Sequence, residues 1–132
     1  MGDVSSVLIA AKQLAVIASA LNIPVFLVDV RGKLEFLNGA AERVLGNRYD
    51  EVGPATPAER GARWSPTNVE GAPIPVQHLP SMAVLRNRQP VHRFLNIVGR
   101  NGASQRLEVS AFPLKDANGE LLGAVGFFWD TA

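Results

Sequence analysis

The chain has 132 residues, of which 47% are hydrophobic and 19% are charged, a composition typical of one globular domain that buries its own core. Its formal net charge of +1 predicts no electrostatic field strong enough to attract nucleic acid or other polyanions. The chain has no cysteine, which excludes disulfides, thiolate metal sites and cysteine nucleophiles.

The first 22 residues predict an amphipathic helix that precedes the core domain in the chain. Its apolar residues recur alternately four and three positions apart, the spacing of a helix that pairs with another helix. We therefore expect this helix to end before Pro24 and to form the contact of a homodimer. Packing on its own domain is the alternative, and the apolar surface is broad enough for both. The residues expected at the dimer contact are Val7, Ala11, Leu14 and Ala18.

Residues 7–21 are apolar, but they predict neither a membrane span nor a targeting signal. Lys12 and Gln13 interrupt the run, whereas a span needs about 20 continuous apolar residues. The chain begins with the acidic Met1-Gly2-Asp3, whereas a signal peptide begins with basic residues. The expected location is therefore the cytoplasm, without membrane contact.

A β-hairpin is predicted at the start of the remaining domain. The runs VFLVDV and KLEFLN are short, rich in β-branched and aromatic residues, and separated by Arg31-Gly32. Asn38 follows the second run and suits the N-cap of a helix over residues 39–45, because its side-chain oxygen can accept an unpaired backbone N–H. Gly46 is expected to end that helix.

The middle of the chain has weaker signals. Residues 47–76 contain much of the proline and glycine and show no sustained period, so we expect short helical turns inside a long connection. The sequence HLPSMAVLRNR predicts a longer helix over residues 78–88, which Gln89-Pro90 ends.

Three strands are predicted in the last third, over residues 91–99, 104–114 and 121–130. In the second strand Leu107 and Val109 alternate with polar neighbours, which indicates one buried face and one wet face. The third strand is apolar on both sides and is expected to be covered on both faces. Its glycines, Gly123 and Gly126, mark places where another backbone or a ligand comes close.

This order of elements predicts an α+β fold with a five-stranded antiparallel sheet. The helices of the middle section can cover one face of the sheet, and the N-terminal helix or a partner can cover the other. We divide the chain into an N-terminal helix, residues 1–22, and a core domain, residues 23–132.

Three stretches of the core domain carry a family resemblance. These are VFLVDVRGKLEFLNGAAERVLG, EGAPIPVQHLPSMAVLRNRQPV and GRNGASQRLEVSAFPLKDANGELLGAVGFFWDT. They are similar to the opening hairpin and helix, the long helix, and the closing three strands of a PAS domain. Such domains are the sensory modules of histidine kinases, diguanylate cyclases, sigma-factor regulators and transcription factors.

The resemblance implies a regulatory module that dimerises and relays a small-molecule or partner signal to an output domain outside this chain. The family commonly ends in Asp, an aliphatic residue and Thr or Ser, followed by a signalling helix. Here Trp129-Asp130-Thr131 lacks the middle residue and Ala132 ends the chain, so we expect a piece of a longer signalling protein. The alternatives are a ligand-free protein-interaction module and a haem-binding sensor.

No enzyme signature is present in the sequence. It contains neither a phosphate-binding glycine loop nor a nucleophile elbow, so we expect no enzymatic activity. Some haem-binding PAS domains use a histidine near the position of His78, but Pro80 places His78 at the start of its helix. The flavin photoreceptors of the family need a cysteine that this chain lacks. We therefore expect no cofactor and no metal, with haem at His78 and a redox flavin that needs no thiol as the exceptions to test.

A ligand, if one binds, is expected in an apolar pocket inside the core domain. The residues proposed to line it are Phe36, Leu45, Trp64, Met82, Leu85, Phe94 and Leu107. The charged residues between 86 and 106 are mostly arginines, but they lack the interleaved exposed aromatic residues of a nucleic-acid site. They are expected to form a solvated face.

Overall fold

The computed structural model describes residues 4–99 and 102–131 and has the α+β arrangement that the sequence predicts. The sequence also predicts a turn at Arg100-Asn101-Gly102, of which Arg100 and Asn101 lie outside the described residues. The elements are, in chain order, α1 (Val4–Ala20), β1 (Val25–Asp29), β2 (Leu34–Leu37), α2 (Gly39–Leu45), α3 (Tyr49–Val52), α4 (Pro57–Trp64), the short 3₁₀ turn η1 (Val76–His78), α5 (Pro80–Asn87), β3 (Val91–Val98), β4 (Ser104–Lys115) and β5 (Leu121–Asp130).

The five strands form one antiparallel sheet in the order β2-β1-β5-β4-β3. Chain neighbours pair through hairpins at both ends, and β5 inserts beside β1 to join the two groups. The predicted hairpin over 25–38 and the three C-terminal strands are therefore confirmed. Leu107 and Val109 are buried and Arg106 is exposed, as the alternation in this strand predicts.

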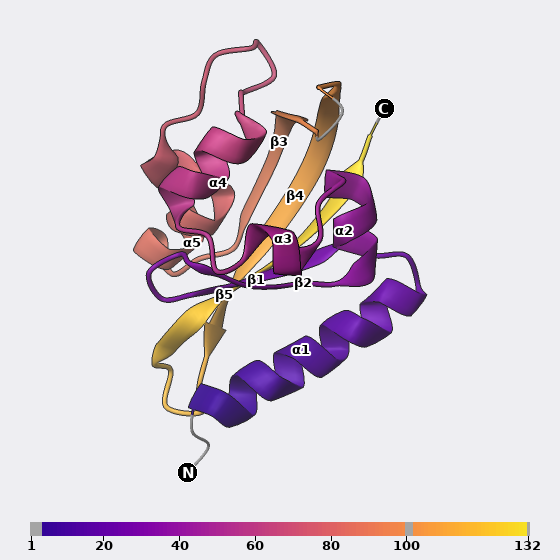
Figure 1. Ribbon diagram of the computed structural model, residues 1–132. Helices are drawn as coiled ribbons and strands as arrows, with labels where there is room; N and C mark the ends of the chain where they lie inside the picture. The colour runs from indigo at the N-terminus through magenta and orange to yellow at the C-terminus, as the bar shows by residue number, and fades with distance from the viewer. Residues whose placement is uncertain (1–3, 100–101, 132) are drawn as a thin grey trace.

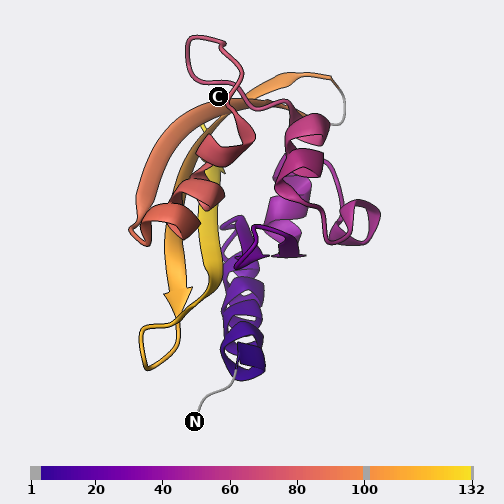
Figure 2. The same ribbon diagram turned by 90° about the vertical axis from the view of Figure 1, so that its left-hand side faces the viewer.

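The helices lie on two sides of the β1–β2 hairpin (Figures 1 and 2). Helix α1 lies on one side of the hairpin, and α3 and α4 lie on the other. Helix α5 packs against β3, β4 and β5. The main core lies between α5, α4, α2 and the sheet, where apolar residues from all of these elements meet.

Helix α1 buries one of its faces on its own domain. It contacts β1 and α2, and Ala15 is 2% exposed. Val25 and Leu27 are fully buried and alternate with Phe26, which faces the main core. The opposite face of α1 remains apolar and exposed, and Leu14 is 67% exposed.

The prediction that β5 is covered on both faces is correct for one face. Phe128 is buried, but Trp129 is 40% exposed and Phe127 is half-buried. The reason is the position of α1, which contacts β1 and α2 and leaves the outer side of β5 partly uncovered.

The side chain of Asn38 joins elements that are distant in the chain. It caps α2 as predicted, since its Oδ1 accepts from the N–H of Ala41 at 2.9 Å. The same oxygen accepts from the N–H of Val25 at 3.0 Å. Its Nδ2 donates to the carbonyl of Ala15 at 2.8 Å and to that of Ile23 at 2.9 Å. Asn38 is 1% exposed, so this buried amide has its hydrogen-bonding capacity well satisfied.

The predicted close approach of another backbone occurs at Gly123, whereas a side chain comes close at Gly126. Gly123 has a φ of 155° and lies against the backbone of Val28, so a side chain there would collide with main-chain atoms. Gly126 pairs with Phe26 across the sheet, and the Phe26 ring occupies the space that a side chain at Gly126 would need. Because Gly126 has no side chain, it leaves room for the Phe26 ring to lie against the sheet.

Within residues 4–99 and 102–131, no helix is long and apolar enough to cross a bilayer.

Candidate functional site

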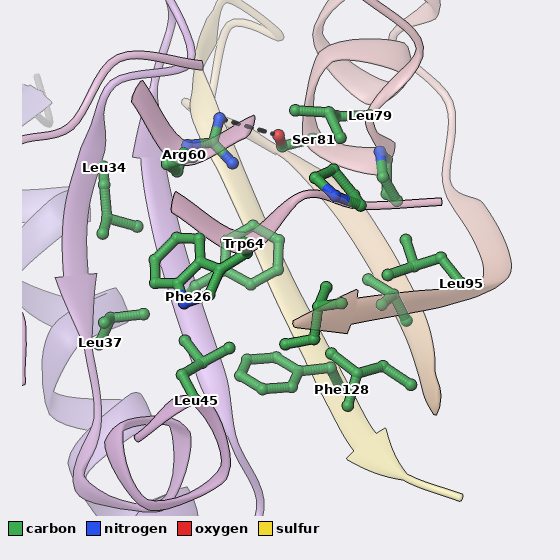
Figure 3. Close-up of a pocket in the computed structure, with 15 residues that line it drawn as sticks. Phe26, Leu34, Leu37, Leu45, Arg60, Trp64, Leu79, Ser81, Leu95 and Phe128 are labelled. Carbon is green, nitrogen blue, oxygen red and sulfur yellow. Dashed lines mark hydrogen bonds between the residues drawn. The ribbon is translucent and has the colours of Figure 1, made fainter. Parts of the chain in front are cut away.

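A cavity of about 110 Å³ lies in the core between the sheet and the helices of its inner face (Figure 3). All but two of the side chains that line it are apolar. The polar exceptions, Arg60 and Ser81, lie at one end, while Leu45 and Phe128 lie at the other (Figure 3). The lining residues are Phe26, Leu34, Leu37, Leu45, Arg60, Trp64, Pro66, Leu79, Pro80, Ser81, Leu95, Ile97, Leu107, Val109 and Phe128.

The structure brings together three of the seven residues proposed for the pocket. Leu45 of α2, Trp64 of α4 and Leu107 of β4 all line the cavity. The other four, Phe36, Met82, Leu85 and Phe94, are not among its lining residues.

Strand register and helix rotation account for these four positions. Phe36 pairs with Leu27, and paired side chains share a face, so Phe36 lies on the α1 side and not on the side of Phe26. Met82 lies against Gly32 in the hairpin turn. Phe94 is 47% exposed and makes an edge contact with His92. The fourth residue, Leu85, packs at the margin of the core.

Helix α4 carries two lining residues, and its start is fixed locally. The Thr56 hydroxyl accepts from the N–H of Glu59 at 3.2 Å, and the Glu59 carboxylate accepts from the N–H of Thr56 at 2.9 Å. This is a capping box followed by Pro57 at the first helical position. Arg60 and Trp64 are four residues apart and therefore share one face of the helix. That face is the one directed at the cavity.

Trp64 is held in place by a buried hydrogen bond. Its indole N–H donates to Oδ1 of Asn47 at 3.2 Å, and both residues are buried. The aromatic ring is therefore fixed as part of the cavity wall and has its polar atom satisfied.

Arg60 reaches across the end of the cavity to two other elements. Its Nη2 donates to the carbonyl of Gly32 at 2.8 Å and to the hydroxyl of Ser81 at 3.2 Å. Its Nε is fully buried and has no hydrogen-bond partner. Burial lowers the pKa of the Arg60 guanidinium to about 10, and the negative charge of Asp29 partly offsets this shift. Arg60 is therefore a cation at neutral pH.

Ser81 comes from the first turn of α5. Pro80 begins this helix, and Ser81 is 1% exposed. Its hydroxyl is the acceptor for Arg60 and keeps a proton of its own to donate.

The histidines lie away from the cavity. His78 is exposed at the end of η1 and does not line the cavity. His92 contacts Glu108 on β4, with 2.7 Å between Nε2 and Oε2. Among the residues that the structure describes, no three His, Asp or Glu side chains are grouped as a metal site. The cavity is smaller than the 150 Å³ cavity that holds benzene in an engineered protein.

Arg60 and Ser81 were missed from the sequence. The capping box T-P-A-E would have predicted a helix from residue 57, with Arg60 and Trp64 on one face. Nothing local would have paired Arg60 with Ser81, because the two are 21 residues apart and meet through tertiary packing.

Comparison with known proteins assigns this chain to a family. A family model described as PAS fold matches residues 18–132. No curated protein matches the chain in sequence at a significant level. Among solved structures, the chain is similar to the PAS domain of a protein from Colwellia psychrerythraea, with a TM-score of 0.67 and 16% identity over 92% of this chain and 96% of that one.

Two further structures have the same fold. The PAS domain of BvgS from Bordetella pertussis has a TM-score of 0.61 and 17% identity, covering 93% of this chain and 86% of that one. The VqmA dimer of Vibrio cholerae, a LuxR-type receptor, has a TM-score of 0.64 and 16% identity, covering 92% of this chain and 51% of that one. At this level of identity the likeness shows a shared fold and nothing further.

Proposed function

Since the chain belongs to the PAS family, the sensory modules of signalling proteins, we propose that it senses a small apolar molecule held in its cavity. The observation that supports this proposal is the cavity, because native cores are normally packed to the density of organic crystals. Apolar walls with a few convergent polar groups are typical of small-molecule sites. PAS domains are in general sensory modules, and we propose no reaction for this one.

The signal would leave the domain through a homodimer, to an output domain or a partner protein. The exposed face of α1 supports this part of the proposal, because contiguous apolar residues on a surface usually mark a partner site. Val7, Ala11 and Ala18 are half-buried and lie toward the edge of this face, whereas Leu14 lies within it. VqmA, which has the same fold, forms a dimer. The more-than-half-exposed apolar residues of the face are Ile9, Leu14, Val16, Ile17 and Leu21.

The dimer is tested by size-exclusion chromatography with light scattering. We expect the parent chain to be a dimer and Leu14→Glu to be a monomer, because a carboxylate at the contact cannot be desolvated without a partner. Gln89→Glu adds the same charge at an exposed position outside α1 and should remain a dimer. A parent chain that is monomeric at high concentration, or a dimeric Leu14→Glu variant, would contradict the proposal.

The ligand is tested by NMR titration with toluene, a probe of one ring. We expect the indole N–H of Trp64, on the cavity wall, to shift, while that of Trp129 on the exposed face of β5 stays unchanged. An absorption spectrum of the purified chain complements the titration. A Soret band would show that the chain binds haem instead of a small apolar molecule. If toluene, benzamide and benzoate all leave the Trp64 indole unshifted, the cavity is closed to ligands and the chain is instead a ligand-free interaction module.

A further inference from the structure

One end of the apolar cavity contains a cation that the protein leaves incompletely paired. Arg60 lines the cavity with its guanidinium, and Figure 3 shows it beside Ser81 at the end opposite Phe128. Its Nη2 forms both of the hydrogen bonds that the side chain makes within the described residues. Its Nε is buried without a hydrogen-bond partner among these residues. A charged group this poorly satisfied is costly inside a protein.

No carboxylate of the described residues forms an ion pair with Arg60. Asp29 is the carboxylate whose charge acts on it, but the Asp29 Oδ1 already accepts from the N–H groups of Arg31 and Lys33, both at 2.9 Å. Oδ1 of Asp29 therefore stabilises the hairpin turn, and the negative charge of Asp29 acts on Arg60 without a direct hydrogen bond. The protein holds the guanidinium in place through two neutral acceptors and gives its charge no direct ion pair within the described residues.

A neutral side chain could make the same structural connection between the hairpin turn and α5. The contacts to Gly32 and Ser81 use one nitrogen, whereas a guanidinium has five N–H donors in a planar fork that suits carboxylates. The hydroxyl of Ser81 can rotate to donate to an anion at the same place. The polar end of the cavity thus has donors for an acid in Arg60 and Ser81.

The size of the cavity limits the rest of the ligand. An apolar cavity of about 150 Å³ holds benzene, and the cavity here is about 110 Å³. The apolar part of a ligand is therefore no larger than one ring or a short branched chain, lying among Phe26, Trp64 and Phe128.

We propose that the cavity binds a small aromatic or branched aliphatic carboxylate, with its carboxylate on the guanidinium of Arg60 and its apolar part among the three aromatic residues. This inference rests on the proposed sensing function and specifies the ligand class of the same site. The carboxylate supplies the missing counter-charge, and charge-assisted hydrogen bonds are about twice as strong as neutral ones. The cavity recognises the ligand by its charge at one end and by apolar contact at the other.

The test compares benzoate with benzamide, a neutral molecule of nearly the same shape, by NMR titration of the Trp64 indole at neutral pH. We expect benzoate to bind about tenfold more tightly than benzamide to the parent chain. Arg60→Gln should abolish this preference, and Arg60→Lys should retain part of it because it keeps the positive charge. Ser81→Ala should weaken benzoate binding about twofold to fivefold.

The ratio of the benzoate affinity to the benzamide affinity shows whether Arg60 recognises the carboxylate or has only a structural role. Loss of a structural contact would weaken benzoate and benzamide together, whereas loss of a counter-charge weakens benzoate alone. If the parent chain binds benzamide or toluene as well as it binds benzoate, this inference is overturned and the proposed sensing function stands. If none of the three probes binds, both are overturned. These parent-chain outcomes do not depend on the folding of any variant.

Discussion

Two polar side chains, the buried Asn38 and the half-buried Arg60, link distant parts of this chain and differ in how far their hydrogen bonds are satisfied. Asn38, between α1, β1 and α2, makes four hydrogen bonds of 2.8–3.0 Å through its two polar atoms. Arg60, at the end of the cavity, makes two through one nitrogen and leaves its buried Nε without a partner. The difference assigns Asn38 a stabilising role and agrees with our proposal that Arg60 binds a ligand.

The largest effect is expected at Asn38. Asn38→Ala should lower the free energy of unfolding by about 2–4 kcal/mol, because it removes the cap of α2 and leaves buried backbone groups of Val25, Ala15 and Ile23 without partners. Urea denaturation measures the change. Asn118→Ala, at the exposed tip of the β4–β5 turn, is the control and should change stability by less than about 0.5 kcal/mol. A loss below about 1 kcal/mol at Asn38 would contradict its structural role.

An intermediate effect is expected at the start of α4, which positions Arg60. Thr56→Ala removes the N-cap and should cost about 1 kcal/mol in urea denaturation. Glu59→Gln is the matched variant, since glutamine also completes a capping box. If Thr56→Ala is as stable as the parent, the capping box does not fix the start of this helix.

The same box predicts a pH dependence. Hydrogen bonds from the backbone and side chain of Thr56 hold the pKa of Glu59 below its usual value. Its stabilising contribution is therefore present above the usual carboxyl pKa and is lost as the pH falls through the lowered pKa of the folded state. Any advantage of the parent over Glu59→Gln should shrink over that acidic range, and an advantage that grows on acidification would refute this account.

The smallest effect on stability is expected at Arg60. Arg60→Met should change the free energy of unfolding by no more than about 1 kcal/mol, because the lost hydrogen bonds are offset by removal of a buried charge. Urea denaturation in the absence of added ligand measures this change. A loss as large as that of Asn38→Ala would erase the contrast between the two regions and make Arg60 a structural residue.

The sequence by itself determined the elements whose signals are local. The alternation of Leu107 and Val109 with polar neighbours predicted the face of β4, because strand side chains alternate by geometry. Asn38 and Gly46 predicted both ends of α2, because caps satisfy backbone groups of the adjacent turn. The order of these elements was sufficient to identify the PAS fold.

Only the tertiary structure decided which side chains share the cavity. Phe36 turned to the α1 side through its pairing with Leu27, a consequence of hairpin register that composition does not reveal. Arg60 meets Gly32 and Ser81 across 28 and 21 residues of chain. Such contacts depend on how α4, α5 and the hairpin pack together, and no short-range periodicity encodes that packing. The fold could therefore be predicted from local patterns, whereas the charged end of its cavity required three distant segments to be brought together.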